Sequence, residues 1–235
     1  MSYTAITNAI RAKANPSRAK HSMRFFKTDK GQYGACDVFL GLTVPMQREI
    51  AKEFQNLEMP AIVELLQSKF HEYRLIALLI LVSQFERGDE HTKKHIVHIY
   101  LKNTERINNW DLVDLSAYNI IGAWLLDKER KILYKLATSK FLWEKRIAIV
   151  STVAFIRNGQ VEDTIKLSTL LVHDTHDLMH KAVGWMLREV GKKNVKALEA
   201  FLLSHAKTMP RTMLRYAIEK FPETQRKKYM NMKHL

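Results

Sequence analysis

A short sequence pattern recurs at intervals of 32 to 40 residues, and this spacing constrains the fold more than any other feature. Each copy places a polar residue before small and apolar residues, in a stretch typical of the second helix of a pair. The polar positions of the five copies, separated by 40, 32, 35 and 34 residues, are Arg74, Asp114, Arg146, Lys181 and Arg215. Helix pairs of this period stack into a right-handed α-solenoid of HEAT-like repeats, so we predict an all-α fold.

Turn-forming residues are scarce, which favours helices along almost the whole chain. The sequence has only eight glycines and five prolines, and no stretch shows a defensible strand pattern. Pro45 and Pro60 are well placed in the first turns of helices that run to about Leu57 and Phe70. Further amphipathic helices are predicted over 72–86, 89–102, 110–126, 129–138, 142–157, 161–172, 176–190, 192–206, 210–220 and 222–230.

The length of 235 residues suits one large domain or one repeat array. We predict a single HEAT-like domain over residues 1–235, with an N-terminal helical and loop cap over about 1–44 and a repeat array over about 45–230. In the cap, a short helix over Thr4–Ala14 ends at Asn15-Pro16. The stretch Phe25–Gly34 is predicted to form an aromatic and basic loop.

The net charge of +14 is concentrated at the two ends of the sequence. Residues 1–30 hold seven Lys and Arg against one acid, and residues 181–235 hold thirteen against four, so the ends contribute +6 and +9. The middle of the chain is left at about −1 by subtraction from +14. A basic excess at both ends suits a nucleic acid that is gripped along its length, although a merely basic protein remains the alternative.

Four of the five repeat positions are basic, and the fifth is Asp114. A row of Arg and Lys on a concave face can follow the phosphates of DNA, which gives the predicted solenoid a basic DNA-binding face. The members of this row are Arg74, Arg146, Lys181 and Arg215. A carboxylate in such a row lowers the affinity for a polyanion, so we expect Asp114 to serve another purpose.

Trp110 lies four residues before Asp114, so both side chains project from one face of the helix that Asn109 caps. The alternative is a half-buried tryptophan beside a capping carboxylate. Trp124 lies in an apolar run and is expected in the core. Two more tryptophans each share a helix face with a basic residue: Trp143 with Arg146, and Trp185 with Arg188.

Three separated motifs resemble the AlkD family of DNA alkylation-repair glycosylases: Trp110–Asp114, Trp143–Arg146 and Gly184–Glu189. The likeness runs from Phe25 onward and includes Phe39–Gly41 before Pro45, and Met209–Tyr216. It implies an all-helical solenoid of HEAT-like repeats. It also implies hydrolysis of the N-glycosidic bond of alkylated purines in duplex DNA, chiefly N3-methyladenine and N7-methylguanine.

The resemblance assigns roles to individual residues. Asp114 matches the catalytic carboxylate, and Trp110 and Trp185 match the aromatic residues that flank the deoxyribose of the lesion. Arg146 matches a family arginine that lies near the catalytic site. The predicted DNA-binding residues are Arg146, Arg188, Arg74, Lys181, Arg215 and Trp143. Phe25 falls near a family position that can be tyrosine, so a hydroxyl contact is expected to be missing.

The chemistry that the resemblance implies needs few groups. An N3- or N7-alkylated purine is already cationic and leaves as a neutral base, so no general acid is required. The oxocarbenium-like sugar needs an anion and an oriented water, both of which Asp114 can supply. Trp110 and Trp185 can offer π faces to the cationic sugar, each worth about 0.5–2 kcal/mol. The resemblance further suggests that the lesion is read within the duplex, because an open solenoid face provides no deep pocket.

We expect neither metal nor cofactor. The stretch His173–Asp177 with His180 has ligand types but no zinc spacing, and Cys36 lacks the surroundings of a nucleophile. A single cysteine fits a reducing cytosol, and no apolar run is long enough for a membrane span. A cytoplasmic, nucleoid-associated monomer acting on double-stranded DNA is therefore predicted. Two alternatives stay open: a non-catalytic paralogue that binds unusual DNA structures, and a HEAT-type protein-interaction scaffold.

Overall fold

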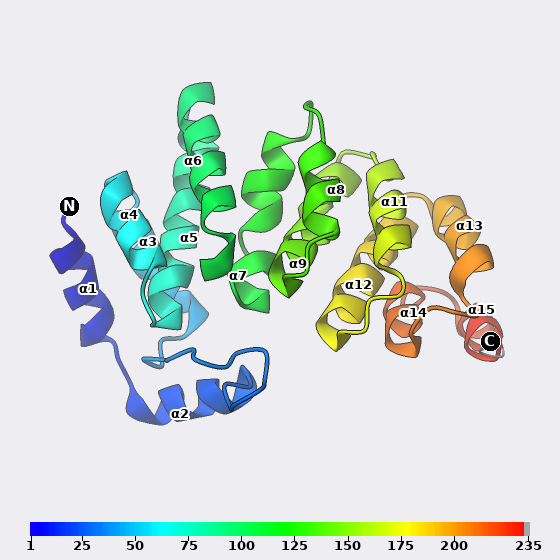
Figure 1. Cartoon of the computed structure of the whole chain (residues 1–235), viewed down its shortest axis with the longest axis horizontal. Helices are drawn as coiled ribbons and strands as arrows, with labels where there is room; N and C mark the ends of the chain where they lie inside the picture. Colours follow the sequence, from blue (N-terminus) through cyan, green and yellow to red (C-terminus); the bar gives the residue numbers. More distant parts are fainter. Residues whose placement is uncertain (233–235) are drawn as a thin grey trace. The chain divides into compact units, whose positions relative to one another are not determined.

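The computed structural model describes residues 1–232, and their regular secondary structure is helical (Figure 1). Within this part of the chain the only β feature is an isolated bridge between Val38 and Phe70. The chain forms two compact units, one over Met1–Ser116 and one that begins at Ala117. The prediction of an all-α fold is confirmed.

The first unit is built around one long buried helix. Its helices are α1 (Tyr3–Ala12), α2 (Pro16–Phe25), α3 (Val44–Glu53), α4 (Met59–Leu66), α5 (His71–Arg87), α6 (Glu90–Lys102) and α7 (Trp110–Asp114). The apolar run Leu75–Leu78 gives α5 buried residues around its circumference, as a central helix requires. Accordingly, α5 packs against α3, α4, α6 and α7.

The second unit repeats this arrangement around α12. It opens with a π-helical turn, η2 (Tyr118–Gly122), and continues through α8 (Lys131–Ala137), α9 (Leu142–Ser151), α10 (Val153–Arg157), α11 (Glu162–Leu171), α12 (Asp177–Lys193), α13 (Val195–His205), α14 (Arg211–Ala217) and α15 (Glu223–Met230). Contacts join helices that are close in sequence, such as α8 with α9 and α12 with α13 and α14. Contacts between sequence neighbours are typical of stacked helical repeats.

The N-terminal segment contains a helix that the sequence analysis missed. Asn15-Pro16 was expected to end the first helix, and α1 does end shortly before it, at Ala12. The same pair also starts α2, because the Asn15 side chain accepts a hydrogen bond from the backbone N–H of Arg18 and Pro16 occupies the first turn. A proline at that position needs no N–H partner and has the right φ angle. This segment belongs to the same compact unit as α3 to α7.

The helix predicted over 110–126 is interrupted. α7 ends at Asp114, and the π-helical turn begins only at Tyr118. Between them, the Ser116 hydroxyl lies 2.5 Å from the Leu112 carbonyl oxygen and 2.9 Å from the buried Tyr100 hydroxyl. Hydroxyl bonds to a carbonyl four residues earlier bend helices. Trp110 and Asp114 are therefore carried by a helix of little more than one turn.

Within residues 1–232 no helix combines the length and apolar character that crossing a bilayer would require.

Candidate functional site

A buried histidine between two carboxylates lies at the centre of the first unit. His71, at the start of α5, is 1% exposed. Its Nδ1 lies 3.1 Å from Oδ2 of Asp37, and its Nε2 lies 2.8 Å from Oδ2 of Asp111. Burial alone would lower the pKa of His71, but the charge of Asp111 and the hydrogen bonds to both carboxylates raise it to about 9. The imidazole is therefore protonated at neutral pH and donates from both nitrogens.

Asp37 extends this network to two further residues. Its Oδ1 accepts a hydrogen bond from Nη2 of Arg74 at 2.6 Å, and its Oδ2 accepts one from Nδ2 of Asn109 at 3.1 Å. Burial would raise the pKa of Asp37, yet the hydrogen bond from His71 and the charge of Arg74 hold it below its usual value. Four charged groups, Asp37, His71, Arg74 and Asp111, thus compensate one another inside the protein.

This network fixes the start of α7. The Asn109 side-chain oxygen accepts a hydrogen bond from the backbone N–H of Trp110 at 2.8 Å, so the predicted N-cap is confirmed. Oδ1 of Asp111 accepts one from the backbone N–H of Leu112 at 2.9 Å. The side chains of Asn109 and Asp111 therefore link α7 to the buried Asp37 and His71. The same two side chains also accept hydrogen bonds from backbone N–H groups in the first turn of α7. Trp110 and Asp114 are thus carried on a short helix whose first turn is anchored by buried side chains.

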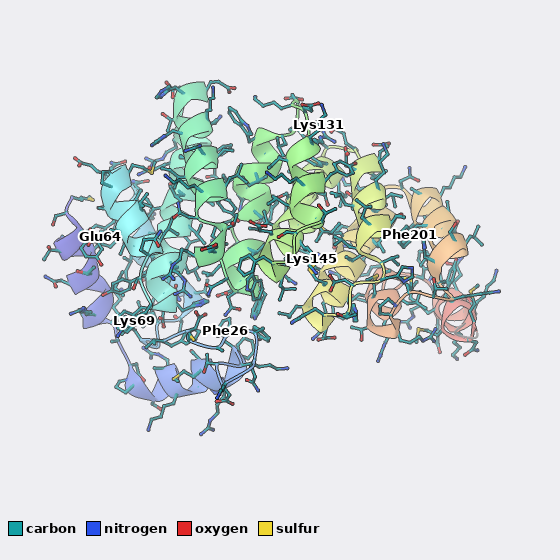
Figure 2. All side chains as sticks on the ribbon, viewed as in Figure 1. Phe26, Glu64, Lys69, Lys131, Lys145 and Phe201 are labelled. Carbon is teal, nitrogen blue, oxygen red and sulfur yellow. The ribbon has the colours of Figure 1, made fainter. Side chains whose placement is uncertain are left out.

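Aromatic rings cover the network. The Phe26 ring is stacked on Trp110, with centroids 5.4 Å apart and planes at 19°, and on Phe39, with centroids 5.0 Å apart. Its centroid is also 5.0 Å from that of His71. Phe26 thus lies between α2 and the helices α5 and α7 (Figure 2). Phe25 meets Trp110 edge-on at 6.0 Å and is 59% exposed, so an aromatic edge faces solvent beside Trp110.

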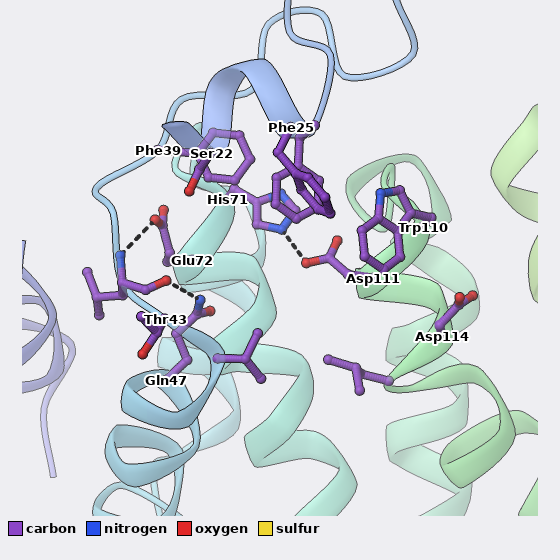
Figure 3. Close-up of a pocket in the computed structure, with 14 residues that line it drawn as sticks. Ser22, Phe25, Phe39, Thr43, Gln47, His71, Glu72, Trp110, Asp111 and Asp114 are labelled. Atoms are coloured by element: carbon purple, nitrogen blue, oxygen red, sulfur yellow. Dashed lines mark hydrogen bonds and ion pairs between the residues drawn. The ribbon is translucent and has the colours of Figure 1, made fainter. Parts of the chain in front are cut away.

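A cavity of about 390 Å³ lies beside Trp110, where the sequence analysis expected no deep pocket. Both Trp110 and Asp114 line it, as expected for two side chains on one helix face. Asp111 points toward His71, whereas the carboxyl group of Asp114 points to the other side of Trp110 (Figure 3). The lining residues are Ser22, Phe25, Phe26, Phe39, Leu42, Thr43, Val44, Gln47, His71, Glu72, Trp110, Asp111, Asp114 and Leu115.

Two of the four basic residues in the predicted row, Arg74 and Arg146, are buried. Arg74 is 2% exposed, and its guanidinium donates to Asp37 and, at 2.9 Å, to the Ser68 carbonyl oxygen. Arg146 is also buried, and its Nη1 donates to the Leu178 carbonyl oxygen at 2.6 Å. A guanidinium committed to buried partners cannot follow the phosphates of DNA. The role of Arg146 near the reacting sugar stays a prediction.

Trp143 is buried on α9, so its ring is part of the core, and its contact with DNA stays a prediction. Arg188 is ion-paired with Glu189 and Glu219, which reduces the positive charge that it can offer to a phosphate. Lys181 pairs with Asp177 at 2.7 Å but remains substantially exposed, and Arg215 is exposed. These two basic residues stay candidates for DNA contacts.

Trp185 is half-buried on α12 and lines a second cavity, of about 300 Å³, in the second unit. The cavity is also lined by Arg157, Lys192 and Lys193, so it has a basic rim. Trp185 thus keeps an accessible ring surface, which Trp143 does not. Its predicted role at the deoxyribose stays a prediction.

A family model described as DNA alkylation repair enzyme matches residues 6–221. The chain belongs to this family of DNA alkylation repair enzymes. The resemblance drawn from the sequence motifs is thereby confirmed. A solved structure described as a predicted DNA alkylation repair enzyme from Enterococcus faecalis is similar, with a TM-score of 0.70 over 90% of this chain and 98% of that chain. At 16% identity, that likeness shows a shared fold. Comparison with curated proteins finds no match.

In this member of the DNA alkylation repair family, Trp110 and Asp114 were predicted as site residues from the sequence, whereas the buried residues that anchor their helix were not. Asp37 and His71 are 34 residues apart, and His71 and Asp111 are 40 apart. No local spacing motif joins such positions. Asp111 carried a partial signal as a carboxylate in the first helical turn, and Phe26 carried one as part of the predicted aromatic loop.

The histidine-rich stretch before α12 has a capping role in this family member. Nδ1 of His176 accepts a hydrogen bond from the backbone N–H of Leu178 at 3.1 Å, and Nε2 of His180 lies 2.6 Å from the Asp174 carbonyl oxygen. Asp174 is also ion-paired with Lys145. Across residues 1–232, no group of three His, Cys, Asp or Glu side chains is arranged to hold a metal ion.

Proposed function

We propose that this protein is a DNA glycosylase that hydrolyses the N-glycosidic bond of cationic N3- and N7-alkylated purines in duplex DNA. The observation that carries the proposal is the pairing of Trp110 and Asp114 on a short helix, α7, that a buried ion network fixes. It occurs in a chain that belongs to the DNA alkylation repair family. A carboxylate beside an indole, on a helix whose start is anchored by buried hydrogen bonds, suits a reaction in which positive charge develops on a sugar.

The proposed reaction follows from the charge of the substrate. The alkylated purine carries a positive charge, so when the bond between C1′ and the ring nitrogen breaks, the electron pair leaves with the base and neutralises it. The sugar is left as an oxocarbenium-like cation. Asp114 stabilises this cation and orients a water molecule, which adds to C1′ and releases a proton. The products are the free base and an abasic site.

Aromatic side chains assist the same step. Trp110 presents its indole to the cationic sugar, and the resemblance assigns Trp185 of the second unit the other aromatic role. Each π face contributes about 0.5–2 kcal/mol when the cation is desolvated. Such contacts stabilise the transition state more than the ground state, since the sugar becomes cationic only as the bond breaks.

The partner in this proposal is double-stranded DNA that contains alkylated purines, bound by a monomer. The net charge of +14 supplies general attraction to the duplex. Lys181, which is partly exposed, and Arg215, which is exposed, are the proposed phosphate contacts. Because phosphate contacts carry no sequence information, they hold the duplex while the lability of the cationic base provides selectivity.

The direct test is to incubate the purified protein with methylated duplex DNA and to measure the free base released. We expect release of 7-methylguanine and 3-methyladenine, with binding to unmodified duplex at low salt. Duplex binding without base release would instead indicate the non-catalytic paralogue. Absence of any affinity for duplex at low salt would indicate the protein-interaction scaffold.

A further inference from the structure

The cavity beside Trp110 contains a buried hydrogen-bond acceptor without a partner. Gln47 on α3 is 3% exposed, and its Nε2 donates to the Leu42 carbonyl oxygen at 3.1 Å. This hydrogen bond fixes the orientation of the amide, because only its nitrogen can donate. Oε1 of Gln47 is buried, and no atom of residues 1–232 donates a hydrogen bond to it. Leaving such an acceptor unpaired is unfavourable, so the pocket suits a ligand with an N–H or O–H donor.

Other polar groups of the cavity are engaged within the protein. Oε1 of Glu72 accepts hydrogen bonds from the backbone N–H groups of Leu40, Gly41 and Leu42, at 3.0, 2.7 and 3.3 Å. Asp111 is held by His71. Gln47 therefore contributes to the cavity a buried acceptor that no described residue satisfies.

The walls of the cavity suit a flat ring system. Phe26, Phe39 and Trp110 provide aromatic surface, and Leu42, Val44 and Leu115 provide aliphatic surface. Gln47 comes from α3 on one side, and Trp110 comes from α7 on the other (Figure 3). The volume of about 390 Å³ lies near the lower end of the range for small-molecule sites, about 300–1,000 Å³.

The charges around the cavity argue against a phosphorylated ligand. Three acidic residues, Glu72, Asp111 and Asp114, are among the lining residues, against the single cation of His71. A phosphate would be repelled by this excess of negative charge, whereas a neutral or cationic ring would not. The chemistry favours a free base over a nucleotide.

We propose that this pocket binds a free purine base, with its ring against the aromatic wall and its exocyclic amino group donating to Oε1 of Gln47. The choice of an alkylated purine as the base rests on the proposed function, whereas the pocket itself requires only a flat ring with an N–H donor. Both 7-methylguanine and 3-methyladenine carry such an amino group. The carboxyl group of Asp114 points to the other side of Trp110 (Figure 3), so the pocket is a compartment for the released base next to the site of bond cleavage.

The test is a titration of the full chain with 7-methylguanine, and separately with 3-methyladenine, followed in the 1H–15N spectrum. We expect shifts of the Gln47 side-chain amide and the Trp110 indole. Gln47→Met, which keeps the shape but removes the acceptor, should bind each base roughly tenfold more weakly. The matched control is Gln84→Met on α5, because the Gln84 amide donates to the Gln55 and Leu57 carbonyl oxygens outside the cavity. The Gln84→Met variant should bind each base with the affinity of the wild type.

Two results would overturn the proposal. One is the absence of shifts at Gln47 and Trp110 in the wild type with millimolar base, a measurement that does not depend on any variant folding. The other is equal affinity of Gln47→Met and the wild type. The same wild-type preparation is assayed for base release from methylated duplex. Release without base binding would reject the pocket alone, and base binding without release would reject the glycosylase alone.

Discussion

At the scale of single residues, the protonation of His71 determines how the first unit responds to pH. The imidazolium of His71 and the guanidinium of Arg74 together balance the charges of Asp37 and Asp111, and deprotonation of His71 would leave two buried carboxylates with Arg74 as the one remaining cation of this network. The groups packed around His71 are Asp37, Asp111 and Arg74, with Glu72 next to it in the chain. The rings of Phe26 and Phe39 exclude water from it.

This arrangement predicts a pH-dependent stability. The pKa of His71 is raised from 6.5 to about 9 by folding, so the native state binds one more proton than the unfolded state between these values. The stabilisation is complete below pH 6.5 and is lost as the pH rises through about 9. We expect urea denaturation to show a loss of roughly 1–3 kcal/mol across this window. His71→Gln should remove the dependence, whereas His91→Gln, at an exposed position on α6, should retain it. A flat wild-type profile would show that His71 is neutral.

At the scale of secondary-structure elements, the long helices could be predicted from the sequence, whereas the local breaks could not. The apolar periodicity placed α5, α6 and α12 correctly because burial of one face or of the whole helix determines that pattern. The break after Asp114 depends on Ser116, whose hydroxyl meets Tyr100 in a different helix. The helical propensities of residues 110–126 cannot predict a contact with a residue of another helix.

Part of the candidate site could likewise be predicted from the sequence, and part could not. The shared face of Trp110 and Asp114 follows from a spacing of four residues on α7, so it could be read from the sequence. The degree of exposure could not be predicted from the sequence: Arg74 and Lys181 occupy equivalent places in the repeat, yet Arg74 is buried against Asp37 and Lys181 is partly exposed. The difference comes from Asp37, which lies outside the repeat array predicted over about 45–230.

A glycine at the contact between α12 and α14 gives a prediction at this scale. A Cβ at Gly184 would lie 2.6 Å from the Met213 carbonyl oxygen and 2.5 Å from Cβ of Tyr216, so backbone would have to move. At Gly191, on the same helix, it would meet the flexible end of the Leu198 side chain. Gly184→Ala should therefore lower the free energy of unfolding by about 1–3 kcal/mol, whereas Gly191→Ala should be near neutral or stabilising. Equal stability of the two variants in urea would show that α12 and α14 are not closely packed.

At the scale of the whole molecule, the distribution of charge is the property that DNA binding would use. The ends of the chain carry its net positive charge, while several central basic groups are neutralised by internal partners. Counting basic residues along the repeat therefore overestimates the number of cations that are accessible on the surface. The cations able to contact a DNA phosphate are those that remain accessible, such as Lys181 and Arg215.

This distinction can be measured through the salt dependence of duplex binding. Each phosphate contact contributes a slope of about −0.9 to the plot of log affinity against log salt. The double substitution of Lys181→Ala with Arg215→Ala should reduce the slope by about two units. The pair Lys131→Ala and Lys135→Ala removes the same charge from exposed positions on α8 and should leave the slope nearly unchanged. Equal slopes for the two double variants would remove Lys181 and Arg215 from the interface.

The most direct measurement of the proposed function is single-turnover release of 7-methylguanine from duplex DNA by Asp114→Asn. This change keeps the shape of the side chain but removes the negative charge that stabilises the sugar cation, so we expect a rate at least about a hundredfold lower, with duplex binding retained. Asp127→Asn, at an exposed position in the second unit, should match the wild type. Release by Asp114→Asn at the wild-type rate would contradict the central claim that Asp114 is the catalytic carboxylate.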